Sequence, residues 1–252
     1  MAGSVEGKKI FCVIDKHVGF ECLKFLINNF ARDSYTIVIG GNSPSETYDL
    51  LLLNSIKYIK IQDFNPENFQ NTHFDWLLNL WGNIIFKKEF LNCFEHTLNI
   101  HPSYLPYCRG SDPIVWTIQN QCICGVTLHC ISQDVDCGDI WYQQELKLGP
   151  IIKGKDLYST LIELSITTFK EQWGNIRNLV ISPVRQPNLD NGIIHKRRML
   201  LADRLIDAED TMKVKDFILK VNSHDFYPKY TAICTLNNKK YGITLNLEEI
   251  NE

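Results

Sequence analysis

The sequence predicts an α/β fold in which a mostly parallel sheet is flanked by helices, followed by a small C-terminal α+β extension that ends in a β-hairpin. Short apolar runs alternate with amphipathic segments through the first half of the chain, which is the pattern of right-handed βαβ units. The chain has 252 residues, of which 44% are hydrophobic and 22% charged. This length and composition are sufficient for a sizeable buried core.

Hydrophobic periodicity assigns the elements of the first half. Helical spacing of apolar residues predicts a helix over 18–30, and Ser43-Pro44 opens a second helix that carries Leu50 to Leu53, with the proline in its first turn. Residues 65–70 and 87–94 separate later elements. Short apolar runs predict buried strands at 10–14, 35–39, 58–61, 76–80 and 98–100. This alternation predicts a Rossmann-like sheet.

The second half has a different pattern. Two strands, at 125–131 and 140–144, flank a turn at Asp136-Cys137-Gly138, and a long amphipathic helix is predicted over 155–176. Gly192 and the stretch from Pro183 to Pro187 break the pattern and place a domain boundary near residue 180, which separates a main domain at 1–180 from an extension at 181–252. The extension is predicted to contain a helix around 212–221 and two strands, 229–236 and 240–245, joined by Asn237-Asn238.

The terminal hairpin needs a surface to cover its apolar face, because a lone hairpin is marginally stable in water. We therefore expect it to pack on the main domain or on a second subunit, and a homodimer is the predicted assembly.

Composition excludes several classes of function. A formal charge of -3 without an extended basic stripe argues against nucleic acid as a partner. No apolar run reaches the roughly 18 residues of a membrane span, and Met1 to Lys9 contain no apolar signal core, so we expect a cytoplasmic protein without membrane attachment. Nine cysteines without a CxxC, and with Cys122-Ile-Cys124 at the wrong spacing for zinc, predict reduced thiols and no metal site.

Candidate catalytic residues follow the strand at 98–100. In a parallel sheet, ligands bind where strands end at their carboxyl side. Asn99 and His101 lie two residues apart, so their side chains project from one face, and Pro102 ends the strand beside them. Asp136 stands on the later turn, where a carboxylate can orient an imidazole. An imidazole, a carboxamide and a carboxylate are the groups needed for acyl transfer to an amine. A structural histidine beside a capping asparagine is the alternative.

These residues belong to a longer signature. Asn99-Ile100-His101-Pro102-Ser103-Tyr104-Leu105-Pro106 is followed by Gly125-Val126-Thr127-Leu128-His129, then by Asp136-Cys137-Gly138-Asp139-Ile140 and Gln143. In this order and spacing, the sequence resembles the formyltransferases that use N10-formyltetrahydrofolate as cosubstrate. The resemblance implies that 1–180 is a formyltransferase catalytic domain.

The resemblance also implies a role for individual residues. Asn99, His101 and Asp136 match the catalytic asparagine, histidine and aspartate of the family, and His129 matches a histidine that supports them from behind. A strand histidine bonded to backbone is the alternative for His129. The positions that match the folate site are Trp81, Gly82, Ile84, Ile85 and Phe86 on one side, and Ser132, Gln133, Asp134 and Val135 on the other. Plain core packing is the alternative for 84–86.

The acceptor is predicted from the loop after His101. Pro106-Tyr107-x-Arg109-Gly110, with Pro113 and Trp116 after it, is most similar to the sugar-nucleotide N-formyltransferases, which formylate a dTDP-linked amino-dideoxysugar such as dTDP-4-amino-4,6-dideoxyglucose for O-antigen or other surface-glycan (lipopolysaccharide) biosynthesis. Cys108 departs from the asparagine of those relatives. The predicted nucleotide-sugar residues are Ser103, Tyr107, Arg109, Gly110, Lys196 and Arg197. The last two belong to a short basic cluster, and a cluster this short is more often a solvated surface than a binding site.

Three other functions remain open. With water as acceptor, the same residues would make a formyltetrahydrofolate deformylase. A non-catalytic module that binds ligand on the same scaffold is the second alternative. A hydrolase with a cysteine nucleophile is the least favoured, because no cysteine stands at a predicted strand-to-helix elbow.

Overall fold

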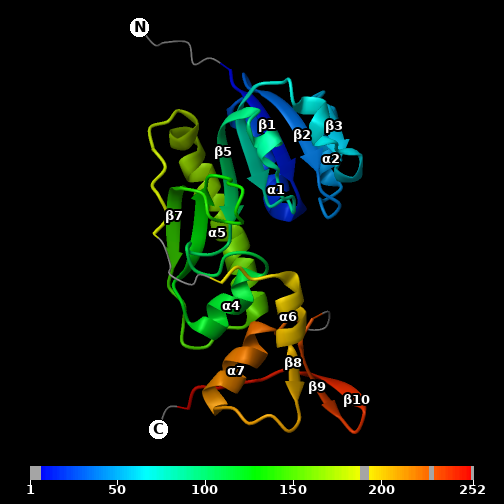
Figure 1. The fold of residues 1–252 in the computed structure, drawn as a ribbon, viewed down its shortest axis with the longest axis vertical. Helices are drawn as coiled ribbons and strands as arrows, with labels where there is room; N and C mark the ends of the chain where they lie inside the picture. Colours follow the sequence, from blue (N-terminus) through cyan, green and yellow to red (C-terminus); the bar gives the residue numbers. More distant parts are fainter. Residues whose placement is uncertain (1–6, 188–192, 227–229, 251–252) are drawn as a thin grey trace. The chain divides into compact units, whose positions relative to one another are not determined.

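Seven strands form one sheet in the computed structural model, which describes residues 7–187, 193–226 and 230–250 (Figure 1). The pairs from β3 to β5 are parallel, and β6 pairs antiparallel with β5. This is the mostly parallel, Rossmann-like sheet that the sequence predicts. The strands, in order across the sheet, are β3 (Tyr58–Lys60), β2 (Ser34–Ile39), β1 (Lys9–Ile14), β4 (Phe74–Leu80), β5 (Phe94–His101), β6 (Cys124–His129) and β7 (Ile140–Leu146).

The described chain falls into two compact units. Unit 1 takes its residues from Met1–His101, Val126–Gln144 and Glu163–Pro187. Unit 2 takes its residues from Pro102–Gly125, Glu145–Ile162 and Asn188–Glu252. The domain boundary near residue 180, between the catalytic domain and the C-terminal extension, stays a prediction.

One face of the sheet in unit 1 is covered by phenylalanines. Phe11 is fully buried on β1. Edge-to-face and tilted aromatic pairs of this kind add to the stability gained from apolar burial. The rings of five phenylalanines lie with their centroids 5.2–5.8 Å from that of Phe11: Phe64, Phe69, Phe74, Phe90 and Phe94.

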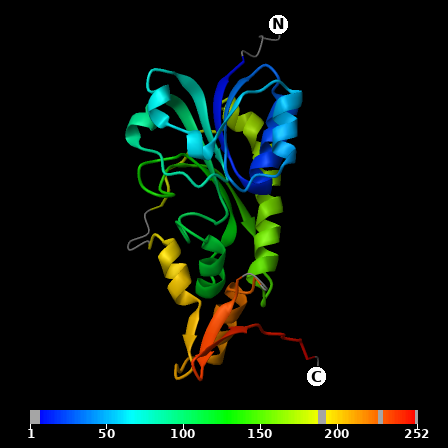
Figure 2. The same cartoon turned by 90° about the vertical axis from the view of Figure 1, so that its right-hand side faces the viewer.

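Two helices supply the apolar contacts of the other face. The centroid of Phe25, on α1 (Lys16–Asn29), lies 6.3 Å from that of Phe169, in the later turns of α5 (Gly154–Arg177), so these helices lie side by side (Figure 2). Trp173, one turn further along α5, lies 5.1 Å from Trp76 on β4. The long helix predicted over 155–176 is confirmed within one residue at each end.

A buried ion pair joins the end of α5 to the segment before β2. Arg177 donates from Nε to Asp33 Oδ2 at 2.9 Å and from Nη2 to Asp33 Oδ1, and the two side chains are 3% and 0% exposed. The backbone N–H of Lys8 donates to the same carboxylate at 2.8 Å. The charge is therefore fully compensated within unit 1.

The connections of unit 1 are short. Helix α2 (Glu46–Leu53) begins two residues later than the sequence predicts, because Ser45 is its N-cap and Pro44 precedes the helix. The remaining elements are the 3-10 turns η1 (Ile61–Asp63) and η2 (Pro66–Phe69) and the single-turn helix α3 (Lys88–Leu91).

Unit 2 contains three elements that the sequence analysis did not predict: α4 (Pro113–Asn120), α6 (Arg197–Asp203) and β8 (Leu205–Asp207). All three are short, and α4 follows a polar loop without a side-chain N-cap. Helix α7 (Val214–Ser223) confirms the predicted helix around 212–221 and packs against α4.

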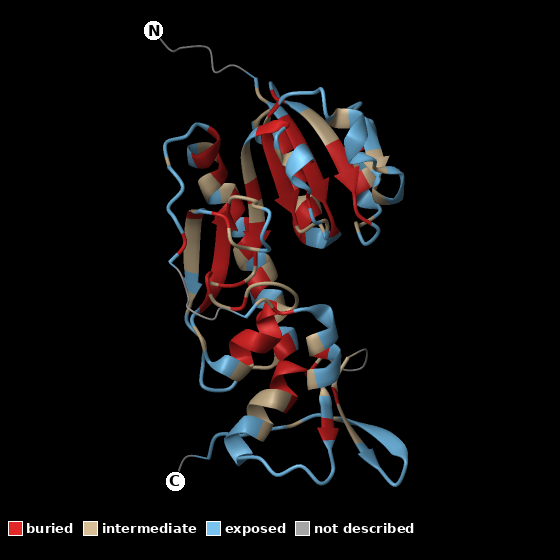
Figure 3. Ribbon diagram, in the orientation of Figure 1, coloured by how far each residue is buried: buried red, intermediate tan, exposed pale blue. Residues whose placement is uncertain are grey.

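The C-terminal hairpin is confirmed. Strands β9 (Ala232–Leu236) and β10 (Lys239–Ile243) pair antiparallel, and β8 pairs parallel with β9. Asn237 and Asn238 have φ values of 49° and 60°, the positive angles that a two-residue hairpin turn of type I′ requires. Lys229, the predicted start of the first strand, lies outside the described residues. Much of the hairpin is exposed, whereas the strands of the large sheet are mostly buried (Figure 3).

All nine cysteines are free thiols. Within the described ranges, no helix is long and apolar enough to cross a bilayer. The same part of the chain contains no group of three or more metal-ligating side chains that could hold a metal ion.

Candidate active site

Three polar side chains form a row across the buried sheet of unit 1. Strand register places Asn79 of β4 opposite Asn99 of β5, and Asn99 opposite His129 of β6. Side chains at paired positions of adjacent strands point to the same face. The row is therefore a direct consequence of strand register, and its members come from segments up to 50 residues apart in sequence.

Hydrogen bonds fix the orientation of each side chain in this row. His129 Nδ1 lies 2.8 Å from the carbonyl oxygen of Cys130, which can only accept, so Nδ1 carries the proton. In the neutral ring, Nε2 then accepts from Asn99 Nδ2 at 2.9 Å. Asn99 Oδ1 in turn accepts from Asn79 Nδ2 at 2.8 Å. The amide group of Asn99 is thus held with its N–H groups on the His129 side.

Asp136 lies between the two histidines of the site. Its Oδ2 is 3.5 Å from His101 Nδ1, and its Oδ1 is 3.6 Å from His129 Nε2. These separations are within ion-pair range and longer than a good hydrogen bond, as is common in catalytic sites without substrate. The side chains of His101, His129 and Asp136 are only 6%, 3% and 13% exposed. The structure therefore brings Asn99, His101, His129 and Asp136 together in one nearly buried cluster.

A second polar row lies next to the first. His101 pairs with Thr127 of β6, and Gln143 Nε2 on β7 donates to Thr127 Oγ1 at 3.1 Å. Gln143, the last residue of the sequence signature, thus supports the strand residue opposite His101.

The loop that carries Asp136 is held by a residue that the sequence analysis missed. Gln186, 5% exposed, donates from Nε2 to the carbonyl oxygens of Asp136 at 2.9 Å and Gly138 at 2.6 Å. Asp136 has a φ of 53°, a left-handed conformation that aspartate tolerates better than most residues. Gln186 lies between Pro183 and Pro187, in the stretch that predicts a domain boundary, and no local pattern indicates that it belongs to the site.

The predicted folate residues line a hollow of about 80 Å³ beside this cluster. Ile85 and Val135, at its rim, are 80% and 37% exposed, and exposed apolar side chains beside a buried polar cluster are typical of a binding surface. Phe86 also packs in the phenylalanine core, where it stacks on Phe90. The hollow is lined by Asn79, Ile84, Ile85, Phe86, Asn99, His129, Ile131, Ser132, Gln133, Asp134, Val135 and Asp136.

The remaining two predicted folate residues, Trp81 and Gly82, do not line this hollow. Gly82 accepts from Asn79 Nδ2 at 3.2 Å through its carbonyl oxygen. A Cβ at Gly82 would lie 2.4 Å from Asn79 Oδ1 and 2.5 Å from a methyl carbon of Val13, so only glycine fits at this position. Gly82 therefore shapes the Asn79 side of the row.

The predicted nucleotide-sugar residues belong to unit 2. Ser103 is fully buried, and its hydroxyl donates to the carbonyl oxygen of Tyr107 at 2.8 Å. This hydrogen bond stabilises the loop between the two residues. Arg109 and Gly110 lie beside His195: the backbone N–H of His195 donates to Arg109 O at 2.9 Å, and a Cβ at Gly110 (φ 92°) would lie 2.2 Å from His195 O. Gly110 is thus required by both conformation and space.

The basic cluster of unit 2 has mixed surroundings. His195 is buried and stacks on Trp116 with 4.2 Å between ring centroids. Arg197 donates to Asp112 Oδ1 at 2.6 Å, while Lys196 is exposed at the N-cap of α6. Arg197 and Lys196 thus keep their cationic groups at the surface of unit 2.

Asn79 was not among the predicted site residues. It is the one polar residue in the apolar run Trp76-Leu77-Leu78-Asn79-Leu80, and that interruption of a buried strand was the available signal.

Replacing Asn79 with alanine is expected to lower kcat for the reaction of this site by about tenfold, because one hydrogen bond that orients Asn99 is worth about 1–1.5 kcal/mol. Asn79→Asp is expected to lower kcat further, since a carboxylate faces Asn99 Oδ1 with no donor. KM for the amine should stay unchanged, which separates positioning from substrate binding. Asn83→Ala, at an exposed asparagine nearby, is the matched control. Equal kcat for Asn79→Ala and Asn83→Ala would refute the role.

Comparison with known proteins gives two kinds of similarity. Residues 69–168 match the family model described as "Formyl transferase". Methionyl-tRNA formyltransferase of Borrelia garinii is 33% identical over 122 residues, which are 48% of this chain and 36% of that protein. The chain thus spans about a third of the length of the first curated relatives it matches.

Solved structures match over nearly the whole chain at low identity. A 4-N formyltransferase from Francisella tularensis has a TM-score of 0.83 at 21% identity, covering 96% of this chain and 99% of that one. An N-formyltransferase from Helicobacter canadensis, solved with folinic acid and dTDP-3-aminofucose, has a TM-score of 0.71 at 18% identity, covering 93% and 86%. These similarities establish the fold.

Proposed function

We propose that this chain, which carries a formyl transferase domain over residues 69–168, transfers the formyl group of N10-formyltetrahydrofolate to the amine of a nucleotide-linked amino sugar. The observation that carries the proposal is the buried cluster in which the Asp136 carboxylate lies within 4 Å of both His101 and His129, with Asn99 hydrogen-bonded to His129. An amide donor, an imidazole and a carboxylate at one point supply what acyl transfer to an amine requires.

Each residue has a defined role in the proposed reaction. The amine nitrogen attacks the formyl carbon, and His101 accepts the proton that the nitrogen loses. Asn99 Nδ2 donates to the oxygen that becomes negative in the tetrahedral intermediate, and the protonated His101 stabilises the same charge. Asp136 holds the imidazolium by its charge. When the bond from the formyl carbon to N10 breaks, the proton returns to N10 and tetrahydrofolate leaves.

We propose that the folate cosubstrate binds at the hollow beside this cluster. The apolar side chains of Ile84, Ile85 and Val135 provide a surface for a flat ring, and polar groups of Ser132 and Asp134 lie at its edge. A few polar groups around an apolar surface are typical of small-molecule sites. We infer that the pterin lies here and directs the formyl group toward Asn99 and His101.

The acceptor proposal rests on the loop of unit 2. Tyr107, Arg109 and Gly110 follow the catalytic strand directly in the chain, and a guanidinium group is suited to phosphate oxygens. Lys196 and Arg197 offer surface cations for a diphosphate. We propose a dTDP-linked amino-dideoxysugar, of the dTDP-4-amino-4,6-dideoxyglucose type, and a role in O-antigen or surface-glycan synthesis in the cytoplasm. The similarity over nearly the whole chain to solved structures described as sugar N-formyltransferases supports this acceptor.

Methionyl-tRNA is the second candidate acceptor, because the curated relatives with matching sequence use that name. The formal charge of -3 argues against it, since binding to the phosphates of an RNA requires a strongly basic surface.

We also propose a homodimer through the C-terminal hairpin. Leu236 and Tyr241 are 48% and 49% exposed there and need a covering surface. Sedimentation of the full chain would give twice the monomer mass of 29.2 kDa, whereas a monomer at all concentrations would exclude this arrangement.

A direct assay tests the proposed reaction. The protein is incubated with N10-formyltetrahydrofolate and, in separate reactions, dTDP-, UDP- and GDP-linked amino sugars, methionyl-tRNA and buffer alone. We expect one nucleotide sugar to gain the mass of one CO while tetrahydrofolate is formed. Transfer to methionyl-tRNA alone would keep formyl transfer and overturn the sugar. Release of formate with buffer alone would make the protein a deformylase.

A further inference from the structure

Two cysteine thiols of unit 2 are in direct contact. Cys108 Sγ lies 3.1 Å from Cys122 Sγ, closer than the roughly 3.6 Å at which two sulfur atoms normally touch without bonding or hydrogen bonding. Cys108 precedes Arg109 in the loop after the catalytic strand, and Cys122 lies between α4 and β6. A disulfide has an S–S distance of about 2.05 Å, so only about 1 Å of movement separates the two thiols from bonding distance.

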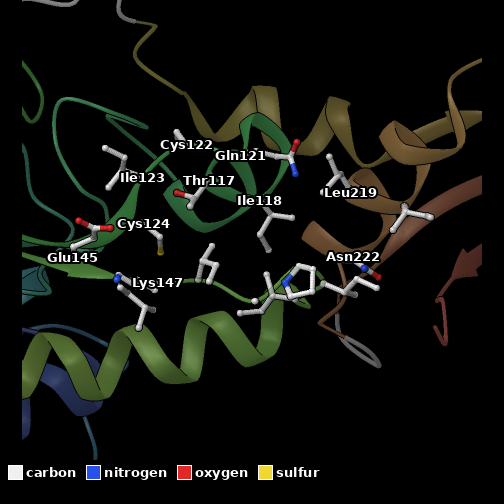
Figure 4. A pocket seen from close by; sticks show the side chains of 17 residues that line it. Thr117, Ile118, Gln121, Cys122, Ile123, Cys124, Glu145, Lys147, Leu219 and Asn222 are labelled. Atoms are coloured by element: carbon white, nitrogen blue, oxygen red, sulfur yellow. The ribbon is translucent and has the colours of Figure 1, made fainter. Parts of the chain in front are cut away.

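The two sulfurs have different surroundings. Cys108 is 8% exposed and packs in a small apolar cluster with Val115, Trp116 and Leu200. Cys122 is only partly buried, and its side chain lines a cavity of about 480 Å³ formed by the ends of α4, β7 and α7 (Figure 4). An oxidant can therefore reach Cys122 first.

Electrostatics favour the same order of events. The hydrogen bond between the two thiols lowers the pKa of Cys122 to about 7. The same hydrogen bond, together with burial, raises the pKa of Cys108. A lowered pKa increases the share of Cys122 present as thiolate, which is the reactive form in thiol–disulfide exchange.

We propose that Cys108 and Cys122 are a site of reversible oxidation that closes to an intramolecular disulfide when it meets a small-molecule disulfide oxidant. The Cys122 thiolate attacks one sulfur of the oxidant, whose S–S bond breaks and releases one thiolate. Cys108 then loses its proton and attacks Cys122 Sγ, which breaks the mixed disulfide and releases the second thiolate. Two cysteine thiols are oxidised, the oxidant is reduced to two thiols, and the two protons pass to them.

The disulfide would link the loop that contains Tyr107 and Arg109 covalently to the short segment between α4 and β6. It does not depend on the proposed formyl transfer, because its formation is detected in the protein itself.

The test uses the full chain with an excess of glutathione disulfide. We expect the intact mass to fall by two hydrogens, the count of free thiols to fall by two, and tryptic peptide 89–109 to be linked to peptide 110–147. Dithiothreitol should reverse all three changes. The rate of oxidation should rise with pH through the region near 7, as Cys122 ionises.

Variants assign the bond to these two residues. Cys108→Ala and Cys122→Ala should each prevent the linked peptide pair. Cys124→Ala is the matched control, because Cys124 lines the same cavity but is 3% exposed and burial raises its pKa to about 12. An unchanged thiol count in wild-type protein, a stable glutathione adduct on Cys122 alone, or a link that survives Cys122→Ala would each overturn the proposal. The wild-type measurement decides the matter even where a variant fails to fold.

Discussion

Replacing His101 with glutamine is expected to reduce kcat for formyl transfer by about 10²–10⁴-fold, the usual contribution of a positioned general base. Glutamine has nearly the length of histidine and can still donate a hydrogen bond, but it cannot accept the proton of the attacking amine. His101 is buried at the carboxyl end of β5, and its Nδ1 faces the Asp136 carboxylate at 3.5 Å. The defect should therefore appear in kcat, measured at saturating folate and amino sugar, with little change in KM.

The matched control is His96→Gln on the same strand. His96 packs against Trp76, with 4.9 Å between ring centroids, and precedes Asn99 on β5. We expect this variant to keep wild-type kcat. If His101→Gln also kept wild-type kcat with a confirmed acceptor, the assignment of His101 as proton acceptor would be wrong.

Replacing Arg177 with alanine is expected to lower the free energy of unfolding by about 3–5 kcal/mol, because it leaves the Asp33 carboxylate buried without its cation. That carboxylate is 0% exposed and would keep the backbone N–H of Lys8 as a neutral hydrogen-bond donor in place of a cation. Since a typical domain is stable by about 5–15 kcal/mol, the loss is a large fraction of the total. Urea unfolding should show a lower midpoint with an unchanged slope.

Two further variants separate charge from packing. The double variant Arg177→Met with Asp33→Leu should recover most of the loss, since a buried pair replaced by apolar groups of similar size costs little. Lys170, on the same helix as Arg177, makes a partly exposed ion pair with Glu21 of α1, and Lys170→Ala should cost no more than about 1 kcal/mol. A loss of that size for Arg177→Ala would contradict the expected effect of burial.

Local pattern was sufficient for the fold of unit 1 and insufficient for much of unit 2. The strands β1, β2 and β4 contain apolar runs between turn residues, and α5 has an apolar stripe over six turns, so these elements are visible in the sequence. Helix α6 and strand β8 have seven and three residues, which is too short for a period to appear. Helix α4 begins at a proline that also reads as loop punctuation.

The predicted catalytic residues were identified for a different reason. Asn99, His101 and Asp136 belong to a signature that can be read along the chain, and the structure places them in one cluster; their roles stay predictions. Asn79 reaches that cluster because its strand pairs with β5 in the register that places it opposite Asn99. Gln186 reaches it because the chain after α5 passes beside the loop that carries Asp136. Neither contact can be predicted from the local sequence, because each depends on which distant strands pair and on the path of the chain between them.

All the hydrogen bonds along the polar row across β4, β5 and β6 are donated in the same direction, from Asn79 toward His129. Asn79 donates to Asn99, Asn99 to His129, and His129 to the carbonyl oxygen of Cys130, which cannot be reversed. Inverting the Asn99 amide would therefore break the bonds on both of its sides, so the dipoles reinforce one another and act cooperatively. A site with a pre-aligned amide has little solvent or side-chain rearrangement left to perform when negative charge develops on a substrate oxygen.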